Sequence, residues 1–224
     1  MYIGYENRSD NNTAATPRFL EVLGGNYLGG IAGGIENKVS ATTHVLTMRI
    51  KGGTVHQYVY GAGQYSAAVG TRKTIITGGT YDAWVAGGCY GTDSNGNAGN
   101  TDGDSYIYFG GDANMTDTEG VFGGGYGRGD AGDNKYTINK SFVVVADDAQ
   151  IAGNVYGGGN KGYNTDDAEV YVLGGGKNTI TVSGSVFGGA NQARSEAKTT
   201  VTLATVIADN PLDYLPSAKR AFVP

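Results

Sequence analysis

The sequence predicts an all-β fold, a right-handed parallel β-helix of about six coils with glycine corners and variable polar loops. Three observations support this fold class. Glycine supplies 40 of the 224 residues, yet no Gly-X-Y period of the collagen type is present. A hydrophobic residue followed by a glycine cluster recurs along the chain. Runs rich in β-branched and aromatic residues, with apolar residues at alternate positions, indicate strands between these copies.

The hydrophobic residue before each glycine cluster identifies one repeat, and we name it the marker. The markers are Ile31, Val59, Val85, Val121, Val155 and Val186. Their spacing ranges from 26 to 36 residues, as expected for one fixed unit that carries loops of different length. Because one unit cannot bury its apolar side alone, we expect the units to stack at about 4.8 Å and to share a continuous core.

The part of each unit before the marker predicts a glycine corner and a short strand. Paired glycines begin seven residues before Ile31, Val59 and Val85. A large apolar residue stands four positions before five of the markers; these residues are Tyr27, Val55, Tyr81, Ile151 and Val182. Val121 is the exception, because Asp117 occupies that position. Its unit is expected to be bulged or differently wound.

Longer strands are expected upstream of the glycine corners and at the end of the repeat, at 45–50, 73–77, 105–109, 141–145, 168–173 and 198–203. No stretch combines helical periodicity with capping residues, so essentially no helix is expected. The repeat predicts one β-helix domain at 19–203. Residues 1–18 are expected to form a peripheral N-terminal segment. Residues 204–224 are expected to form a C-terminal cap or linker, because the repeat is lost there.

Composition narrows the class of protein. The net charge is −5 and no cluster of Lys and Arg is present, so no nucleic-acid partner is expected. No apolar stretch is long enough to span a membrane, so no membrane insertion is expected. A surface rich in hydroxyls, amides and aromatic rings suits an extracellular or cell-surface setting. The first residues carry no signal peptide, and the chain is expected to be a piece of a longer protein.

Two glycine phrases carry a family resemblance. Gly-Asn-Val-Tyr-Gly-Gly-Gly-Asn at 153–160 and Ser-Val-Phe-Gly-Gly-Ala-Asn at 185–191 resemble glycine-rich repeats in large surface or secreted adhesin-like proteins of gut anaerobic bacteria. The resemblance covers about residues 20–203 and implies a β-helix exported to the cell surface or into a fibre. No catalytic residues come with it. The Val121 unit departs from the pattern in its upstream half.

Two functions from different classes remain open. The first is a structural or adhesive segment that presents loops for binding, with host or bacterial glycans, other copies of the chain or neighbouring repeats of a longer chain as partners. The alternative is a carbohydrate-active β-helix of the phage tail-spike or polysaccharide-lyase kind. That alternative needs carboxylates, or a carboxylate with Arg or Lys, converging on one face of adjacent coils. The sequence pattern identifies no such cluster, so no enzyme is expected.

One loop has the spacing of a calcium site. Asp93, Asn95 and Asn97 occupy alternate positions, and Asp104 falls at the twelfth place counted from Asp93, as in an EF-hand loop. Ala98 stands where that loop has its turn glycine, and no helices are expected on either side. The sequence therefore favours an ordinary solvated loop and leaves calcium as the only cofactor to test.

The aromatic residues suggest both packing and binding. Tyr60, Phe122, Tyr156 and Phe187 each follow a marker, so they predict a ladder of stacked rings with one ring per coil. Another three tyrosines are expected in exposed loops and are the candidates for carbohydrate contact; these are Tyr65, Tyr126 and Tyr163.

Other reactive residue types have simpler explanations. Two carboxylate pairs are adjacent in sequence, Asp147-Asp148 and Asp166-Asp167. Within a strand their side chains would point to opposite faces and could not act on one substrate, so these pairs are expected in solvated turns. His44 and His56 belong to no triad pattern, and Arg128-Gly129-Asp130 is expected to be a chance match to an integrin-binding tripeptide. The single cysteine, Cys89, is expected to be a small core residue. No catalytic residue is predicted.

Overall fold

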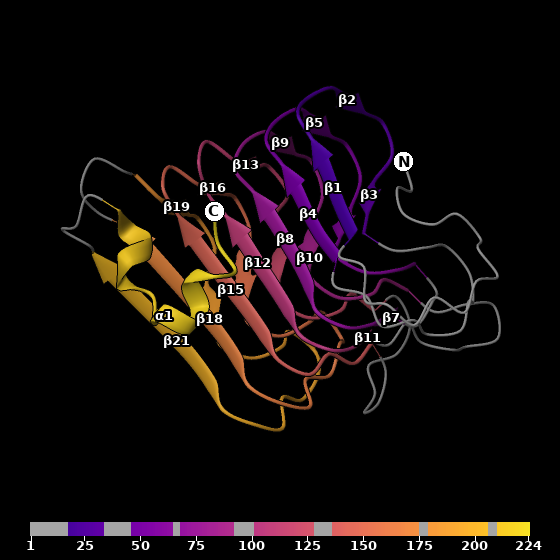
Figure 1. Ribbon diagram of the computed structural model, residues 1–224, viewed down its shortest axis with the longest axis vertical. Helices are drawn as coiled ribbons and strands as arrows, with labels where there is room; N and C mark the ends of the chain where they lie inside the picture. The colour runs from indigo at the N-terminus through magenta and orange to yellow at the C-terminus, as the bar shows by residue number, and fades with distance from the viewer. Residues whose placement is uncertain are drawn as a thin grey trace.

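The computed structural model describes residues 18–33, 46–64, 68–91, 101–127, 136–174, 179–205 and 210–224. Within these ranges the chain is a parallel β-helix, in which three parallel sheets run the length of the molecule (Figure 1). Each of six coils contributes one strand to each sheet, and a seventh strand ends the first sheet. The predicted fold class is confirmed.

Sheet 1 holds the long strands. In spatial order they are β1 (Arg18–Val22), β4 (Leu46–Ile50), β8 (Arg72–Ile76), β12 (Ser105–Phe109), β15 (Ser141–Ala146), β18 (Ala168–Gly174) and β21 (Thr199–Thr205). The six longer strands expected from the sequence all lie within two residues of these bounds. They form because β-branched and aromatic residues on alternate positions fill a pleated, half-buried surface.

Sheets 2 and 3 hold the short strands of each coil. Sheet 2 consists of β2 (Asn26–Tyr27), β5 (Thr54–Val55), β9 (Thr80–Tyr81), β13 (Asn114–Met115), β16 (Gln150–Ile151) and β19 (Thr181–Val182). Sheet 3 consists of β3 (Ile31–Ala32), β6 (Val59–Tyr60), β10 (Val85–Ala86), β14 (Gly120–Phe122), β17 (Asn154–Tyr156) and β20 (Val186–Phe187). Strands β7 (Ala68–Val69) and β11 (Thr101–Asp102) pair separately.

The markers form one column of the core. All six are paired in register through sheet 3, from Ile31 to Val186. The first five are fully buried in a cluster with the inward residues of sheets 1 and 2. The marker rule derived from the sequence therefore describes the register of the coils correctly.

The Val121 coil, the fourth, keeps the core but changes the corner. Met115 occupies the place expected for a large apolar residue, because it pairs with Tyr81 on one side and with Ile151 on the other. It stands six positions before Val121 instead of four, so this corner is two residues longer than its neighbours. The expected departure of this unit from the pattern is confirmed, and it is an insertion: Asp117 lies outside the column and Met115 fills it.

The C-terminal segment (210–224) lies against the side of the β-helix. Its two short helices, η1 (Pro211–Tyr214) and α1 (Ser217–Arg220), cross the outer face of sheet 1 (Figure 1). Leu212 and Leu215 are buried there among outward residues of sheet 1. Within the described ranges these are the only helices, and no helix is long and apolar enough to cross a membrane.

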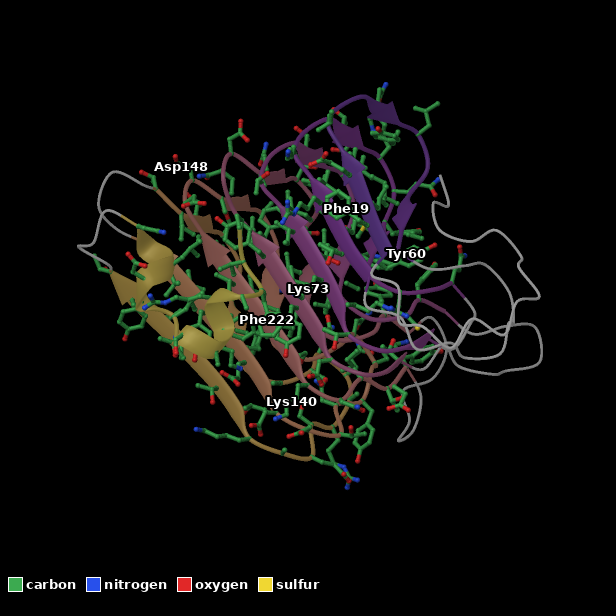
Figure 2. All side chains as sticks on the ribbon, viewed as in Figure 1. Phe19, Tyr60, Lys73, Lys140, Asp148 and Phe222 are labelled. Carbon is green, nitrogen blue, oxygen red and sulfur yellow. The ribbon has the colours of Figure 1, made fainter. Side chains whose placement is uncertain are left out.

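Phe222 extends this contact toward the N-terminal coils. Its ring stacks on Tyr106 with centroids 3.7 Å apart, and the Lys73 ammonium lies 4.7 Å from its centroid (Figure 2). Lys219 forms an ion pair of 2.6 Å with Glu169 on β18. Residues on β1, such as Phe19, remain exposed on the same face. The segment therefore covers sheet 1 from β8 onward.

Candidate binding groove

The outer surface of sheet 3 is built from three columns of residues at fixed offsets from the marker. Strand residues alternate between two faces, so the residues on either side of an inward marker point outward. The preceding column is Gly30, Tyr58, Trp84, Gly120, Asn154 and Ser185. The following column is Ala32, Tyr60, Ala86, Phe122, Tyr156 and Phe187. A third column, five residues after the marker, is Gln64, Tyr90, Tyr126, Asn160 and Asn191.

The aromatic members of these columns form a floor of stacked rings. Trp84 stacks on Tyr58 at 4.5 Å and on Tyr126 at 3.8 Å between ring centroids. Tyr156 stacks on Phe122 and on Phe187, at 4.9 Å in both cases. The predicted ladder is therefore confirmed for its last three rings, while Ala86 interrupts it before Phe122. Because the rings use their faces on one another, they present mainly their edges to the outside.

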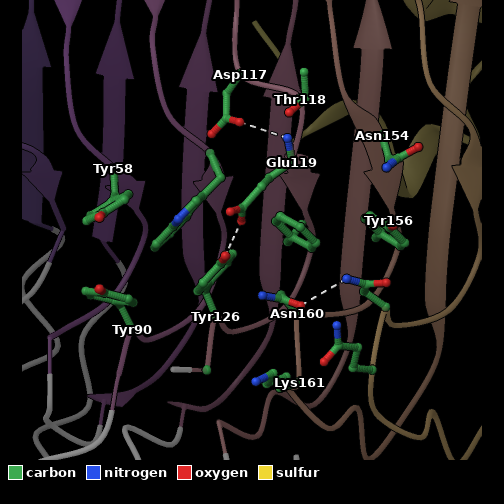
Figure 3. Close-up of a pocket in the computed structure, with 15 residues that line it drawn as sticks. Tyr58, Tyr90, Asp117, Thr118, Glu119, Tyr126, Asn154, Tyr156, Asn160 and Lys161 are labelled. Atoms are coloured by element: carbon green, nitrogen blue, oxygen red, sulfur yellow. Dashed lines mark hydrogen bonds between the residues drawn. The ribbon is translucent and has the colours of Figure 1, made fainter. Parts of the chain in front are cut away.

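The longer corner of the fourth coil brings two carboxylates beside this floor. The Asp117 carboxylate accepts a hydrogen bond of 2.8 Å from the backbone N–H of Glu119. Glu119 in turn accepts a hydrogen bond from the Tyr126 hydroxyl (Figure 3). Gly120 closes the corner with a φ of +109°, and a Cβ there would lie 1.8 Å from the Asn154 carbonyl oxygen. Only glycine fits, which explains how the insertion is accommodated.

Floor and corner together enclose a groove of about 590 Å³. It is lined by Tyr58, Trp84, Tyr90, Asp117, Thr118, Glu119, Phe122, Tyr126, Gly127, Asn154, Tyr156, Asn160, Lys161, Asn191 and Gln192. Asn191 donates a hydrogen bond of 3.1 Å to Asn160, and these two side chains form an amide wall of the groove (Figure 3). This volume lies in the range typical of small-molecule sites, about 300–1,000 Å³.

The groove holds protonated hydroxyls and ionisable carboxylates side by side. Burial raises the pKa of the Tyr126 hydroxyl well above its ordinary value, and the hydrogen bond to Glu119 raises it further. Burial also raises the pKa of Tyr156. Both hydroxyls are therefore protonated at neutral pH. Among the residues that the structure describes, neither Asp117 nor Glu119 forms an ion pair.

The structure corrects the expected exposure of two tyrosines. Tyr126 and Tyr163 were expected in exposed loops, but both are buried, with 8% and 4% of their surface exposed. Tyr126 belongs to the third column, stacks on Trp84 and lines the groove. The Arg194 guanidinium lies over the Tyr163 ring, 5.6 Å from the ring centroid, and Tyr163 does not line the groove. Tyr65 lies outside the described residues.

The calcium prediction falls mostly outside the described residues, since Asp93, Asn95 and Asn97 lie there. Asp104 precedes β12, where its carboxylate accepts hydrogen bonds from the Lys140 backbone N–H at 3.2 Å and from the Tyr106 hydroxyl at 3.3 Å. Within the described ranges, no group of three or more His, Cys, Asp or Glu residues could hold a metal ion. Calcium binding by the loop stays a prediction.

The other sequence candidates lie away from the groove. Asp147 and Asp148 lie in a turn, although Asp147 is also the acceptor for the Tyr108 hydroxyl. His56 is exposed between Asn26 and Asp82, at 2.7 and 2.6 Å. Cys89 is buried, as expected. His44 and 128–130 lie outside the described residues.

Sequence reasoning missed most of the groove. Tyr58, Trp84, Glu119 and Asn191 were not identified, although three of them stand at fixed offsets of one or five residues from a marker. That offset was the available signal. For Glu119 the signal was the irregular spacing of the Val121 unit, which was recognised as a departure but not as the wall of a site.

Comparisons with known proteins add no assignment. No family model matches the chain, and neither the curated proteins nor the solved structures gave a match.

Proposed function

We propose that this chain is a stiff, non-catalytic β-helix segment of a bacterial surface or secreted fibre protein, and that the groove on sheet 3 binds a glycan. The observation that carries the proposal is the composition of the groove. Aromatic edges form its floor, and carboxylates, amides and tyrosine hydroxyls form its polar walls. Few other ligands offer so many hydroxyl groups together with apolar C–H surface.

The polar walls match the chemistry of sugar hydroxyls. A hydroxyl donates one hydrogen bond and accepts others, and an amide side chain such as Asn191 offers both roles in one plane. The Glu119 carboxylate accepts hydrogen bonds, and charge-assisted bonds of this kind are roughly twice as strong as neutral ones. Because the ring faces are already stacked, we expect these hydrogen bonds to supply most of the specificity.

The rigid architecture of the β-helix supports a role in binding a glycan without cleaving it. Each ring of the floor is fixed by rings from adjacent coils, and each coil is fixed by parallel backbone pairing. A groove that is formed before the ligand arrives loses little side-chain entropy on binding. A rigid, preformed groove on a rod suits adhesion.

Binding to a glycan panel, followed by calorimetry, tests this proposal. We expect the double variant Asn191→Ala/Gln192→Ala to lower affinity about tenfold, because each lost hydrogen bond contributes about 0.5–1.5 kcal/mol. Both residues are exposed, so folding should be unaffected. Asn114→Ala, an exposed asparagine on sheet 2, is the matched control. Absence of binding to any glycan would contradict the proposal.

The last coil supports a further structural role, association with neighbouring repeats or other copies. Val201 and Leu203 continue the inward columns of sheet 1, yet 40% and 68% of their surface is exposed. An open sheet end of this kind is a template for another strand. Electron microscopy over a range of concentrations tests this role; we expect linear assemblies, and uniformly monomeric particles would rule them out.

A specific observation favours a second candidate, polysaccharide cleavage. The sequence pattern identified no carboxylates converging with a cation on adjacent coils, but Asp117, Glu119 and Lys161 all line the groove. Release of reducing ends from the glycans that bind would support this candidate. Activity lost in Glu119→Gln would identify the groove as its site, whereas binding without turnover supports the adhesive role.

A further inference from the structure

The groove is elongated along the axis of the β-helix. Its lining residues come from five successive coils, from Tyr58 in the second to Asn191 in the sixth. At about 4.8 Å per coil these residues span roughly 19 Å. The ligand that fills the groove is therefore an oligomer several units long, lying parallel to the axis.

The two ends of the groove differ in chemistry. Coils two to four contribute aromatic side chains, among them Tyr58, Trp84 and Tyr126, while coils five and six contribute the amides of Asn160 and Asn191. The two carboxylates lie at the junction, since Glu119 is bonded to Tyr126 (Figure 3). A ligand thus meets hydroxyl-matching groups at one end and carboxylates beside aromatic rings at the junction.

The negative charge at the junction distinguishes cationic oligomers from neutral and anionic ones. Within the described part of the chain, Asp117 and Glu119 have no cationic partner, and Lys161 is the one cationic side chain that lines the groove. The two carboxylates favour a cation and repel an anion. A protonated amine on the ligand supplies the missing charge and donates hydrogen bonds to both carboxylates.

We propose that the groove binds an amino-sugar oligomer whose amines are free and protonated, with one amine held by Glu119 and Asp117 and the sugar hydroxyls on the amide wall. This inference rests on the proposed glycan-binding function and assigns its ligand class. An N-acetylated oligomer has the same hydroxyls without the charge. A uronic-acid oligomer places a carboxylate against Glu119. Both bind more weakly for these reasons.

Calorimetry with three tetramers tests the assignment: fully deacetylated glucosamine, its fully N-acetylated counterpart and a uronic acid. We expect the deacetylated tetramer to bind roughly tenfold more tightly than the acetylated one, because its ammonium group adds a charge–charge attraction to the hydrogen bond with the carboxylate. Its affinity should fall with added salt. Glu119→Gln should remove the preference, because the neutral amide that replaces the carboxylate cannot pair with an amine; the deacetylated tetramer should therefore lose more affinity than the acetylated one.

Controls separate charge at the groove from net charge and from folding. Glu21→Gln removes one carboxylate from sheet 1, far from the groove, and should leave the preference intact. Should Glu119→Gln unfold, Asp117→Asn carries the same test, because its carboxylate also lacks a cationic partner. Circular dichroism monitors folding in each case.

Each result has a distinct meaning. Equal, salt-independent binding of the acetylated and deacetylated tetramers would overturn the amine assignment and leave the glycan groove standing. Tetralysine bound as tightly as the amino sugar would also overturn it, in favour of a cationic peptide. Binding of none of the tetramers, nor of any glycan on the panel, would overturn the proposed function and this inference together.

Discussion

Two outer faces of the β-helix are built from aromatic columns, but only one of them is covered by the chain itself. On sheet 1, Tyr106 and Phe142 lie beneath the C-terminal segment, whose Leu212, Leu215 and Phe222 pack on that face. On sheet 3, the rings cover one another, and a groove of about 590 Å³ lies along them.

The difference between the faces lies in the residues around the rings. The outward column of sheet 1 continues with apolar residues such as Ile75, Val144 and Tyr171. These residues are buried by the apolar side chains of the C-terminal segment. The rim of sheet 3 carries Glu119 and Asn191 instead, and these polar groups are stable in water. An aromatic outer face with apolar residues around it is therefore covered by another part of the chain. An aromatic outer face with polar residues around it stays open to solvent and can serve as a binding surface.

The largest loss of stability is expected at the corner before β14, where only glycine can adopt the backbone conformation. Gly120→Ala should destabilise the chain by about 3 kcal/mol or more, because the residue has a φ of +109° and its Cβ would overlap the Asn154 carbonyl. Urea unfolding measures the loss. Gly24→Ala is the matched control, since a Cβ there meets no atom within 4 Å. Equal stability of the two variants would contradict the role of Gly120 in forming the groove.

On sheet 1, a large loss of stability is expected without any change in glycan binding. Leu215→Ala should cost about 2–3 kcal/mol of unfolding free energy, because this side chain of the C-terminal segment is 1% exposed and packs on sheet 1. Glycan affinity at the groove should not change, since sheet 3 lies on another side of the helix. Leu23→Ala, at a position 71% exposed, is the control and should change stability little. A loss of binding in Leu215→Ala would show that the two faces are coupled.

The coils could be predicted from the sequence because their signal is local and repeated. Alternation in each long strand and the spacing of glycines before Val59 and Val85 both repeat from coil to coil, so errors in one copy are corrected by the others. The departure of the Val121 unit was visible because Asp117 stands where the other units have a large apolar residue. Its consequence was not, because the position of Met115 follows from pairing with Tyr81 and Ile151.

The groove and the covered face were harder to predict for two physical reasons. Tyr126 follows three glycines, so it was assigned to a loop, whereas the backbone continues in register through Tyr90 and places it in a column. The C-terminal segment has no period, and its contacts join Phe222 to Tyr106, which is more than a hundred residues away in the sequence. Neither feature is encoded within a short window of residues.

Alkaline pH should distinguish the faces through their tyrosines. Burial, with the nearby Asp104 and Glu169 carboxylates, raises the pKa of Tyr106 from 10.0 to about 12. The folded chain holds this proton more tightly than the unfolded chain, so the stability it contributes is complete below pH 10 and is lost as pH rises toward 12. Urea unfolding across this range measures the slope.

The matched variants are one tyrosine from each face. Tyr106→Phe should flatten the alkaline loss of stability and leave glycan binding unchanged. Tyr126→Phe should also flatten it, because the pKa of Tyr126 is raised by burial and by Glu119, but it should weaken binding at the groove as well. An unchanged alkaline slope in both variants would contradict the role of buried tyrosines in this loss.

The smallest effects are expected from the last ring on each face. Phe222 stacks on Tyr106 and contacts Lys73, so Phe222→Ala should cost about 1–1.5 kcal/mol. Phe187 stacks on one face only and is 44% exposed, so Phe187→Ala should cost about 0.5 kcal/mol. Unfolding in urea compares the two. The reverse order would mean that the ladder on sheet 3 stabilises the fold more than the C-terminal cover does, and that the groove is a by-product of packing.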